Sequence, residues 1–206
     1  MEELCEASGP AARGDAQEVQ RLLALRANLA AVDHNEGRTA VHQAAAAGHV
    51  DVLRLLCSAR ADLRALDVRQ LTPLHLAADA GQVDALRFLH SVDASLLFAP
   101  DGAGRAAVHR AAARGRINVL ETLEDLGADL FAVAANGKTA AHYAAEAGQG
   151  QVLEWLPPAR CRDLLDLTES ILRGDKPIKS MWEKETPKRT WLADPEEEEK
   201  TAWPAR

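Results

Sequence analysis

The sequence is poor in cysteine, in aromatic side chains and in long apolar runs. Its 206 residues include only three cysteines, an odd number whose wide spacing fits neither a disulfide framework nor paired metal ligands: Cys5, Cys57 and Cys161. We therefore expect reduced thiols and an intracellular protein, cytoplasmic or nuclear. No apolar run reaches the ~18 residues of a membrane-spanning helix, and the first residues lack the basic and apolar segments of a signal peptide. We expect no membrane partner.

The sequence also has fewer basic than acidic residues. The chain carries 24 basic and 31 acidic residues, a formal net charge of -7. A broad nucleic-acid surface needs many basic side chains against phosphates, so we expect no nucleic-acid partner. Aromatic residues are only 4% of the chain, which favours close packing of helices through small side chains. Other proteins are the expected partners, and a monomer is the expected state.

One pattern occurs four times along the chain. The copies are GRTAVHQAAAAGHVDVLRLL from Gly37, QLTPLHLAADAGQVDALRFL from Gln70, GRAAVHRAAARGRINVLETL from Gly104 and GKTAAHYAAEAGQGQVLEWL from Gly137. The threonine position falls at Thr39, Thr72, Ala106 and Thr139, which gives spacings of 33, 34 and 33 residues. A period of this length indicates stacked repeats. The glycine position extends back to Gly14, so an atypical copy precedes the four.

The copy at Thr72–Ala78, TPLHLAA, resembles the opening of the ankyrin repeat, T-P-L-H-x-A, and the period is also that of the ankyrin-repeat family. The resemblance covers about residues 4 to 156. It implies an all-α ankyrin-repeat solenoid of helix-turn-helix repeats joined by β-hairpin-like loops. The expected divisions are an atypical N-terminal capping repeat (1–36), repeats at 37–69, 70–103 and 104–136, a truncated repeat (137–156), a C-terminal capping helix (157–173) and a disordered tail (174–206).

The residues that recur in register have structural roles in this family. The resemblance implies that Thr39, Thr72 and Thr139 cap the first helix of each repeat, and that Pro73 occupies the first helical position. Ala106 lacks the capping hydroxyl, so we expect the third intact repeat to be locally the weakest. Histidines that recur with the repeat are architectural and tie adjacent loops together through both ring nitrogens: His42, His75, His109 and His142.

One motif suggests nucleotide binding when it is taken alone. GAGRAA, at 102–107, fits G-x-G-x-x-A and follows the apolar stretch SLLFA. Its register is that of the repeat loop, and no parallel sheet is expected around it. The chain also lacks a nucleophile beside a base and a cluster of metal ligands. We therefore expect no enzyme activity, no cofactor and no metal.

The resemblance implies a concave binding face made of hairpin tips and the outward side of the first helices. Register places these partner-binding residues there: Arg38, Arg69, Leu76, Asp79, Arg105, Arg110, Arg114, Lys138, Tyr143 and Glu146. Arg105, Arg110 and Arg114 fall within one repeat, together with Arg116. We interpret them as a basic patch that receives an acidic segment of a partner. The alternative is an ordinary solvated surface.

The last part of the chain has a different composition. Proline, lysine and glutamate dominate from Gly174, and Trp182, Trp191 and Trp203 interrupt this polar stretch. Tryptophan is enriched at binding hot spots, so Trp182 and Trp191 are predicted to bind a partner. The sequence as a whole favours a non-catalytic interaction module or adaptor. The alternatives are an inhibitor of an enzyme such as a kinase, and a substrate adaptor of a ligase complex.

Overall fold

The computed structural model describes residues 9–156. The predicted capping helix and tail, with Trp182 and Trp191, lie outside the described residues. The described part contains ten α-helices, one 3-10 helix and no β-strand, in the order α1 (Pro10–Arg13), α2 (Ala16–Ala24), α3 (Ala40–Ala47), α4 (Val50–Ser58), α5 (Pro73–Ala80), α6 (Val83–Val92), η1 (Ala94–Phe98), α7 (Ala107–Ala113), α8 (Ile117–Asp125), α9 (Ala140–Glu146) and α10 (Gly150–Trp155). The helix pairs confirm the predicted all-α repeat fold.

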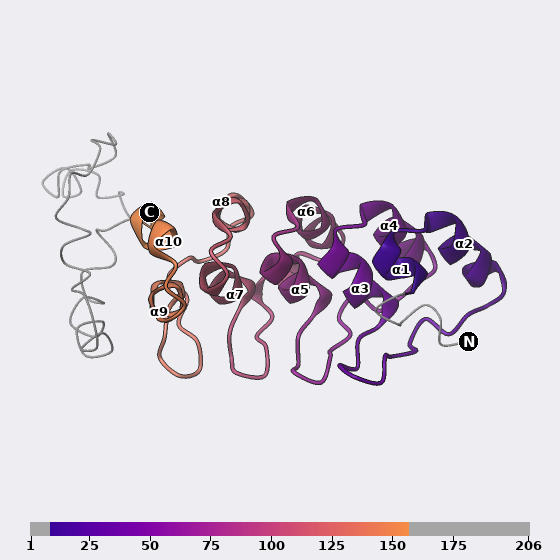
Figure 1. Ribbon diagram of the computed structural model, residues 1–206, viewed down its shortest axis with the longest axis horizontal. Helices are drawn as coiled ribbons and strands as arrows, with labels where there is room; N and C mark the ends of the chain where they lie inside the picture. The colour runs from indigo at the N-terminus through magenta and orange to yellow at the C-terminus, as the bar shows by residue number, and fades with distance from the viewer. Residues whose placement is uncertain (1–8, 157–206) are drawn as a thin grey trace, which may run out of the picture. The chain divides into compact units, whose positions relative to one another are not determined.

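The helices stack in two rows (Figure 1). The first helices of the repeats, α1, α3, α5, α7 and α9, form one row, and the second helices form the other. The loops that join consecutive repeats extend beyond the first row. Pairs of fully buried alanines line the first row and let neighbouring helices approach closely: Ala44 and Ala45, Ala77 and Ala78, Ala111 and Ala112.

Each second helix supplies larger apolar side chains to the core. Val52, Leu53 and Leu56 of α4 are fully buried, and α6 and α8 repeat this arrangement. Val50, Val83 and Ile117, by contrast, are only half-buried. They begin their helices, and the residue two positions later points into the core instead.

The loops between repeats form a hydrogen-bonded row. Within each loop a backbone N–H bonds across the turn, as from Asp67 to the Leu71 carbonyl at 3.1 Å and from Asp101 to Arg105 at 2.9 Å. Neighbouring loops also bond to each other, since the N–H of Val68 donates to the Glu36 carbonyl at 3.0 Å. These bonds connect the loops of successive repeats.

Two irregular elements depart from the simple repeat. The atypical N-terminal copy contains a short first helix, α1, of four residues, which the sequence pattern did not predict. Between α6 and α7 the chain forms η1, where Leu96 and Leu97 are buried. The apolar stretch before the GAGRAA motif is therefore this 3-10 helix, and the motif itself forms a repeat loop and the start of α7.

Candidate protein-binding site

The recurring histidines connect each repeat to the next. In all four intact repeats the ring Nδ1 accepts the backbone N–H of the residue before the first helix, at 3.2 Å for Thr72 and His75 and at 3.0 Å for Ala106 and His109. The opposite nitrogen, Nε2, donates to a carbonyl of the following loop. The acceptors are Leu71 for His42, Arg105 for His75 and Ala132 for His109, at 2.9, 3.1 and 2.8 Å. The predicted use of both ring nitrogens is confirmed for these three histidines.

This pattern changes the role of the threonines. Of the three threonine hydroxyls, only that of Thr72 has a described hydrogen bond from a first-turn N–H, that of His75 at 3.4 Å. The hydroxyls of Thr39, Thr72 and Thr139 instead lie 2.8 to 3.0 Å from the histidine Nδ1. Ala106 lacks this contact but keeps its backbone bond to His109. The imidazole rather than the hydroxyl is therefore the common acceptor at these helix starts.

Burial lowers the pKa of all four histidines below the ordinary value for histidine. The hydrogen-bond geometry agrees with this direction, because a ring that accepts at Nδ1 and donates at Nε2 is neutral. A proton at Nδ1 would face the N–H that now donates to it. The neutral rings of His42, His75 and His109 hold adjacent loops in register.

Buried aspartates shape the loops themselves. The Asp101 carboxylate accepts from the backbone N–H groups of Ala103 and Arg105, each at 2.9 Å. Asp67 accepts in the same way from Arg69 and Leu71, at 2.8 and 2.9 Å. Burial alone would raise the pKa of Asp101, but these N–H donors and the Arg105 guanidinium outweigh it, so the pKa lies below the ordinary value.

In three of the four intact repeats, the fourth residue of the first helix reaches back to its own loop. Gln43 donates to Asp33 Oδ2 at 3.0 Å, and the Tyr143 hydroxyl accepts from Asn136 Nδ2 at 2.9 Å. We expected this position to face the open groove, but Leu76 is only 4% exposed and Tyr143 only 9%. Side chains on a helix tilt toward its N-terminus, which directs this position under the loop. Leu76 and Tyr143 therefore offer a partner little contact area.

Leu76 has no polar group that could donate a hydrogen bond to Asp67, the aspartate of its own loop. The Asp67 side chain is 0% exposed, and its Oδ2 has no hydrogen-bond partner within residues 9–156. The nearest cation is the Arg38 guanidinium, whose Nε lies 3.6 Å away. In the other repeats a polar residue occupies the Leu76 position and contacts the loop, so this repeat lacks one bond that its neighbours have.

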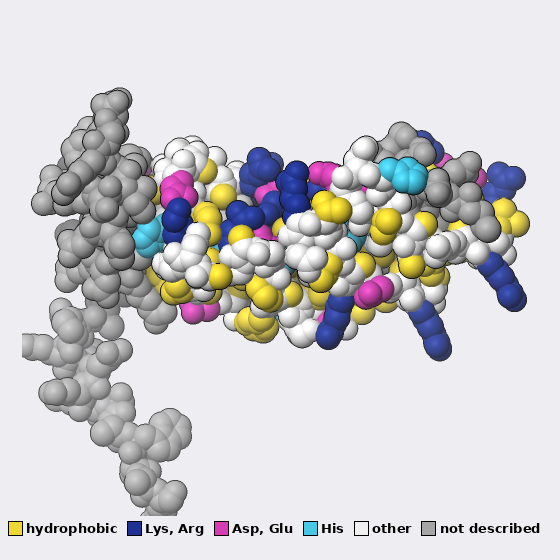
Figure 2. All heavy atoms as spheres, turned by 90° about the horizontal axis from the view of Figure 1, so that it is seen from below, with side chains coloured by type: hydrophobic (Ala, Val, Ile, Leu, Met, Phe, Trp, Pro, Cys, Tyr) yellow, Lys and Arg dark blue, Asp and Glu magenta, His cyan; other side chains and the backbone are white. Residues whose placement is uncertain are grey.

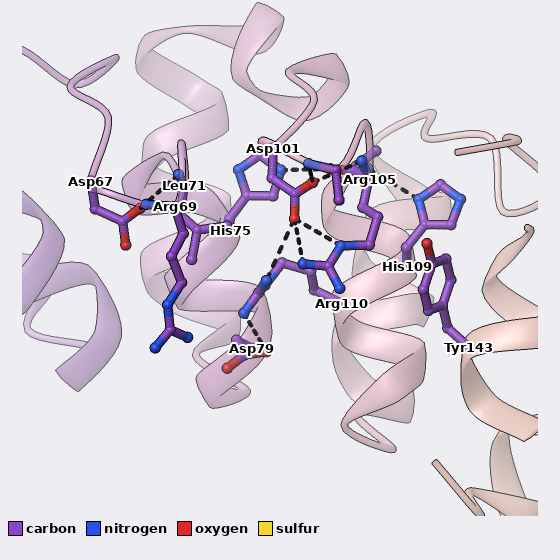
Figure 3. Close-up of polar contacts among 12 residues, drawn as sticks. Asp67, Arg69, Leu71, His75, Asp79, Asp101, Arg105, His109, Arg110 and Tyr143 are labelled. Carbon is purple, nitrogen blue, oxygen red and sulfur yellow. Dashed lines mark hydrogen bonds and ion pairs between the residues drawn. The ribbon is translucent and has the colours of Figure 1, made fainter. Parts of the chain in front are cut away.

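The third intact repeat carries a cluster of arginines, Arg105, Arg110, Arg114 and Arg116, which we call the arginine cluster. Figure 3 shows Asp101 at its centre, with the side chains of Arg105 and Arg110 directed toward it. The Arg105 guanidinium pairs with Asp101 at 2.9 Å, and Arg110 lies 3.5 Å from the same carboxylate. Arg110 also reaches back to Asp79 on α5, at 3.1 Å. It thereby bridges two repeats and is only 10% exposed.

Asp79 is shared by three of these arginines. Its Oδ1 accepts from Arg110 and Arg114, each at 3.1 Å, and its carbonyl accepts from Arg116 at 3.3 Å. Three arginines of the cluster thus pair with two carboxylates, Asp79 and Asp101, and Arg116 bonds the Asp79 backbone carbonyl. Arg114 remains 59% exposed despite its ion pair. Basic side chains gather with acidic ones beside the middle of the stack in Figure 2.

A second group adjoins the cluster in the next repeat. Arg105 lies over the Tyr143 ring, with 5.7 Å from its guanidinium carbon to the ring centroid, and Lys138 lies 5.9 Å from the same centroid. Lys138 also pairs with Glu146. The ring of Tyr143 therefore makes cation–π contacts with both Arg105 and Lys138. These contacts connect the arginine cluster to the last described repeat.

The remaining predicted residues are distributed along the first loops. Arg38 pairs with Glu36 at 2.5 Å and is largely covered, whereas Arg69 lies 3.6 Å from Glu36 and is 65% exposed. The structure thus brings together Asp79, Arg105, Arg110, Arg114, Lys138, Tyr143 and Glu146. Arg38 and Arg69 lie in earlier loops, and Leu76 is buried on α5, the helix that carries Asp79. Sequence reasoning missed the structural role of the loop aspartates, although Asp33, Asp67 and Asp101 recur at spacings of 34 residues.

Within residues 9–156 no group of three or more histidine, cysteine or acidic residues could hold a metal ion. In the same part of the chain, no helix is both long and apolar enough to cross a membrane.

Two family models match the chain. One, described as ankyrin repeats (3 copies), matches residues 8–97, and the other, ankyrin repeats (many copies), matches residues 108–156. The chain belongs to the ankyrin-repeat family. Such repeats generally mediate interactions between proteins, and proteins built from them are typically non-catalytic interaction modules. No curated protein matches the chain closely enough to indicate a relationship.

Proposed function

We propose that this chain is a non-catalytic binding protein that holds an acidic segment of a partner protein against the arginine cluster. The observation that supports this most strongly is the excess of positive charge at one place, where four arginines lie beside two carboxylates, Asp79 and Asp101, among the contacts described within residues 9–156. Charge-assisted bonds to carboxylates are strong and directional when an arginine is held in place. The partner carboxylates would add to the ion pairs already present.

The cluster divides into supporting and contacting residues. Arg110 is covered and bridges Asp79 and Asp101, so it fixes the positions of the others. Arg114 is exposed beside Asp79 and has guanidinium edges open to a second carboxylate. Arg105 and Lys138 extend the positive surface over Tyr143. An acidic segment lying along these residues would cross from the third intact repeat to the fourth.

Charge reversal at Arg114 tests this proposal at an exposed member of the cluster and keeps the side chains of Arg110 and Asp101. The Arg114→Glu variant and the wild-type chain would be used as baits in quantitative affinity capture. Arg87→Glu is the matched control, because Arg87 is similarly exposed but lies on α6 and pairs with Asp125 at 3.3 Å. We expect Arg114→Glu to lose at least 80% of the captured partner, and Arg87→Glu to keep it. Equal capture by all three baits contradicts the proposal.

The carboxy-terminal tryptophans form a separate part of the proposal. Trp182 and Trp191 lie outside the described residues, and their role as a second binding segment rests on their unusual place in a polar stretch. Deletion of residues 174–206 should remove a set of partners different from the set lost with Arg114→Glu. Loss of no partner on deletion would leave the repeats as the sole binding element.

Inhibition of an enzyme and delivery of a substrate to a ligase complex would both use such a surface. Titration of the captured partner separates these roles. An inhibitor reduces the partner's activity stoichiometrically, whereas an adaptor leaves that activity unchanged and retains a further protein.

A further inference from the structure

Two arginines adopt a backbone conformation that normally favours glycine. Arg26 and Arg60 have φ angles of 58° and 62°, and each directly follows the last turn of a second helix, α2 or α4. Gly127 occupies the equivalent place after α8 with φ 86°. The same closing bond is present in all three cases, as from the N–H of Ala61 to the Leu56 carbonyl at 2.9 Å. The left-handed conformation is thus required by the motif, and glycine adopts it without strain.

The two side chains have no structural contact that would explain this strain. Both arginines are exposed. Neither guanidinium has a hydrogen-bond or ion-pair partner in the part of the chain that the structure describes. A cation near the carboxyl end of a helix is favourable, but solvent screens this effect at an exposed site, and it is smaller than the conformational cost. Strained residues of this kind are concentrated at functional sites.

The repeat places these arginines in a regular arrangement. They occupy the same position in successive repeats, so their backbones lie about 10 Å apart, the usual distance between packed helices. Basic side chains project from the N-terminal half of the described stack in Figure 2, at the edge opposite the gathered charges of the middle repeats. The arginine cluster comes from α7 and the loops beside it, whereas Arg26 and Arg60 follow second helices.

We infer that Arg26 and Arg60 form a second binding site, which takes an acidic protein segment with carboxylates about 10 Å apart. An extended chain provides this distance between every third residue, at about 3.3 Å per residue. A protein segment fits better than a nucleic acid, because two isolated arginines on a chain of net charge -7 cannot follow a continuous phosphate backbone. Leu25, the exposed chain neighbour of Arg26, offers an additional apolar contact.

Replacement of both arginines by glycine separates binding from stability. The double variant Arg26→Gly/Arg60→Gly removes the strain and the charges together, so it should raise the Tm by about 2–4 °C per site while it weakens binding. Gln70→Gly is the matched control. Gln70 has φ 60° in a loop whose equivalents carry glycine, so the control relieves similar strain and leaves both arginines in place.

The probe is a fluorescein-labelled peptide of repeated Glu-Gly-Gly units, measured by anisotropy with the full chain at low ionic strength. Every chain compared carries Arg114→Glu, so that the arginine cluster does not contribute to binding of the probe. We expect the double glycine variant to raise the Kd at least fivefold and Gln70→Gly to leave it unchanged, with a higher Tm in both. A Gln-Gly-Gly peptide should not bind. An unchanged Kd or a lower Tm in the double variant overturns the inference, as does stronger binding of single-stranded oligonucleotide than of peptide. If Arg114→Glu alone abolishes peptide binding, the arginine cluster is the site and only this inference fails.

Discussion

The Nε2–H of His75 donates to the backbone carbonyl of Arg105 at 3.1 Å. The two residues belong to successive repeats, and Arg105 is also a member of the arginine cluster. The neutral state of a buried histidine therefore helps to hold one of the cations that we propose to contact a partner. Stability and binding share this hydrogen bond, so a change of pH should affect both.

Acidification should destabilise the stack before the aspartates titrate. Burial lowers the pKa of His42, His75, His109 and His142, so the unfolded chain binds protons first as pH falls. The stability contributed by each ring is complete above the unfolded pKa of about 6.5 and is lost as pH falls toward the folded pKa, by up to about 1.4 kcal/mol per pH unit. The Tm measured from pH 7.5 to 5 should decline steadily from about pH 6.5 downward. A constant Tm over this interval contradicts the proposed hydrogen-bonding state.

Addition of a hydroxyl should strengthen the third intact repeat. Ala106→Thr supplies the contact to His109 Nδ1 that the other three repeats have, at 2.8 to 3.0 Å. We expect an increase of about 0.5–1.5 kcal/mol in the free energy of unfolding, measured with urea. Ala106→Val has the same shape without the hydroxyl and should show no such gain. Equal free energies of unfolding for the two variants would show that the hydroxyl does not stabilise this repeat.

A polar residue in place of Leu76 should be tolerated although the site is buried. A glutamine side chain there, by analogy with Gln43, would donate to the unsatisfied Oδ2 of Asp67, so Leu76→Gln should change stability by no more than about 1 kcal/mol. Leu74→Gln is the control, because Leu74 is fully buried in the apolar core and its replacement should cost about 3 kcal/mol or more. If urea denaturation gave similar losses in the free energy of unfolding for Leu76→Gln and Leu74→Gln, Asp67 would not accept a hydrogen bond from the new glutamine.

Two loop glycines should respond differently to alanine. Gly104 and Gly137 both have positive φ, 71° and 78°, and each alanine incurs about 1 kcal/mol of backbone strain. A Cβ at Gly104 would also lie 2.4 Å from the Cβ of Ala135 and 2.9 Å from its nitrogen, whereas at Gly137 no described atom lies within 4 Å. Gly104→Ala should therefore cost about 1–3 kcal/mol more in the free energy of unfolding. Equal losses would show that the loops do not pack as closely as described.

The fold followed from the sequence because its determinants are local and repeated. Thr72, Pro73 and His75 mark a helix start through contacts within a few residues, and the period of the copies sets the stack. The 3-10 helix at Ala94–Phe98 was not predicted, because it interrupts that period once and has no second copy for comparison.

The site was predicted only in part, because its geometry depends on contacts between repeats. Register placed Arg114 on the surface, where its side chain is 59% exposed, but it gave no sign that Arg110 bridges Asp79 and Asp101. It also placed Leu76 and Tyr143 in the groove, since spacing alone does not include the tilt of helical side chains toward the loop. The strained Arg26 and Arg60 could be recognised only from the backbone angles.

Amide hydrogen exchange of the full chain, alone and with the partner captured by the wild type, tests the proposed binding surface most directly. The account predicts slower exchange in residues 101–116 and 137–146, which carry the arginine cluster, Lys138 and Tyr143. It predicts unchanged exchange rates in the second helices α4 and α6. Slower exchange confined to α4, α6 and α8, with none in residues 101–116, would contradict binding at the arginine cluster.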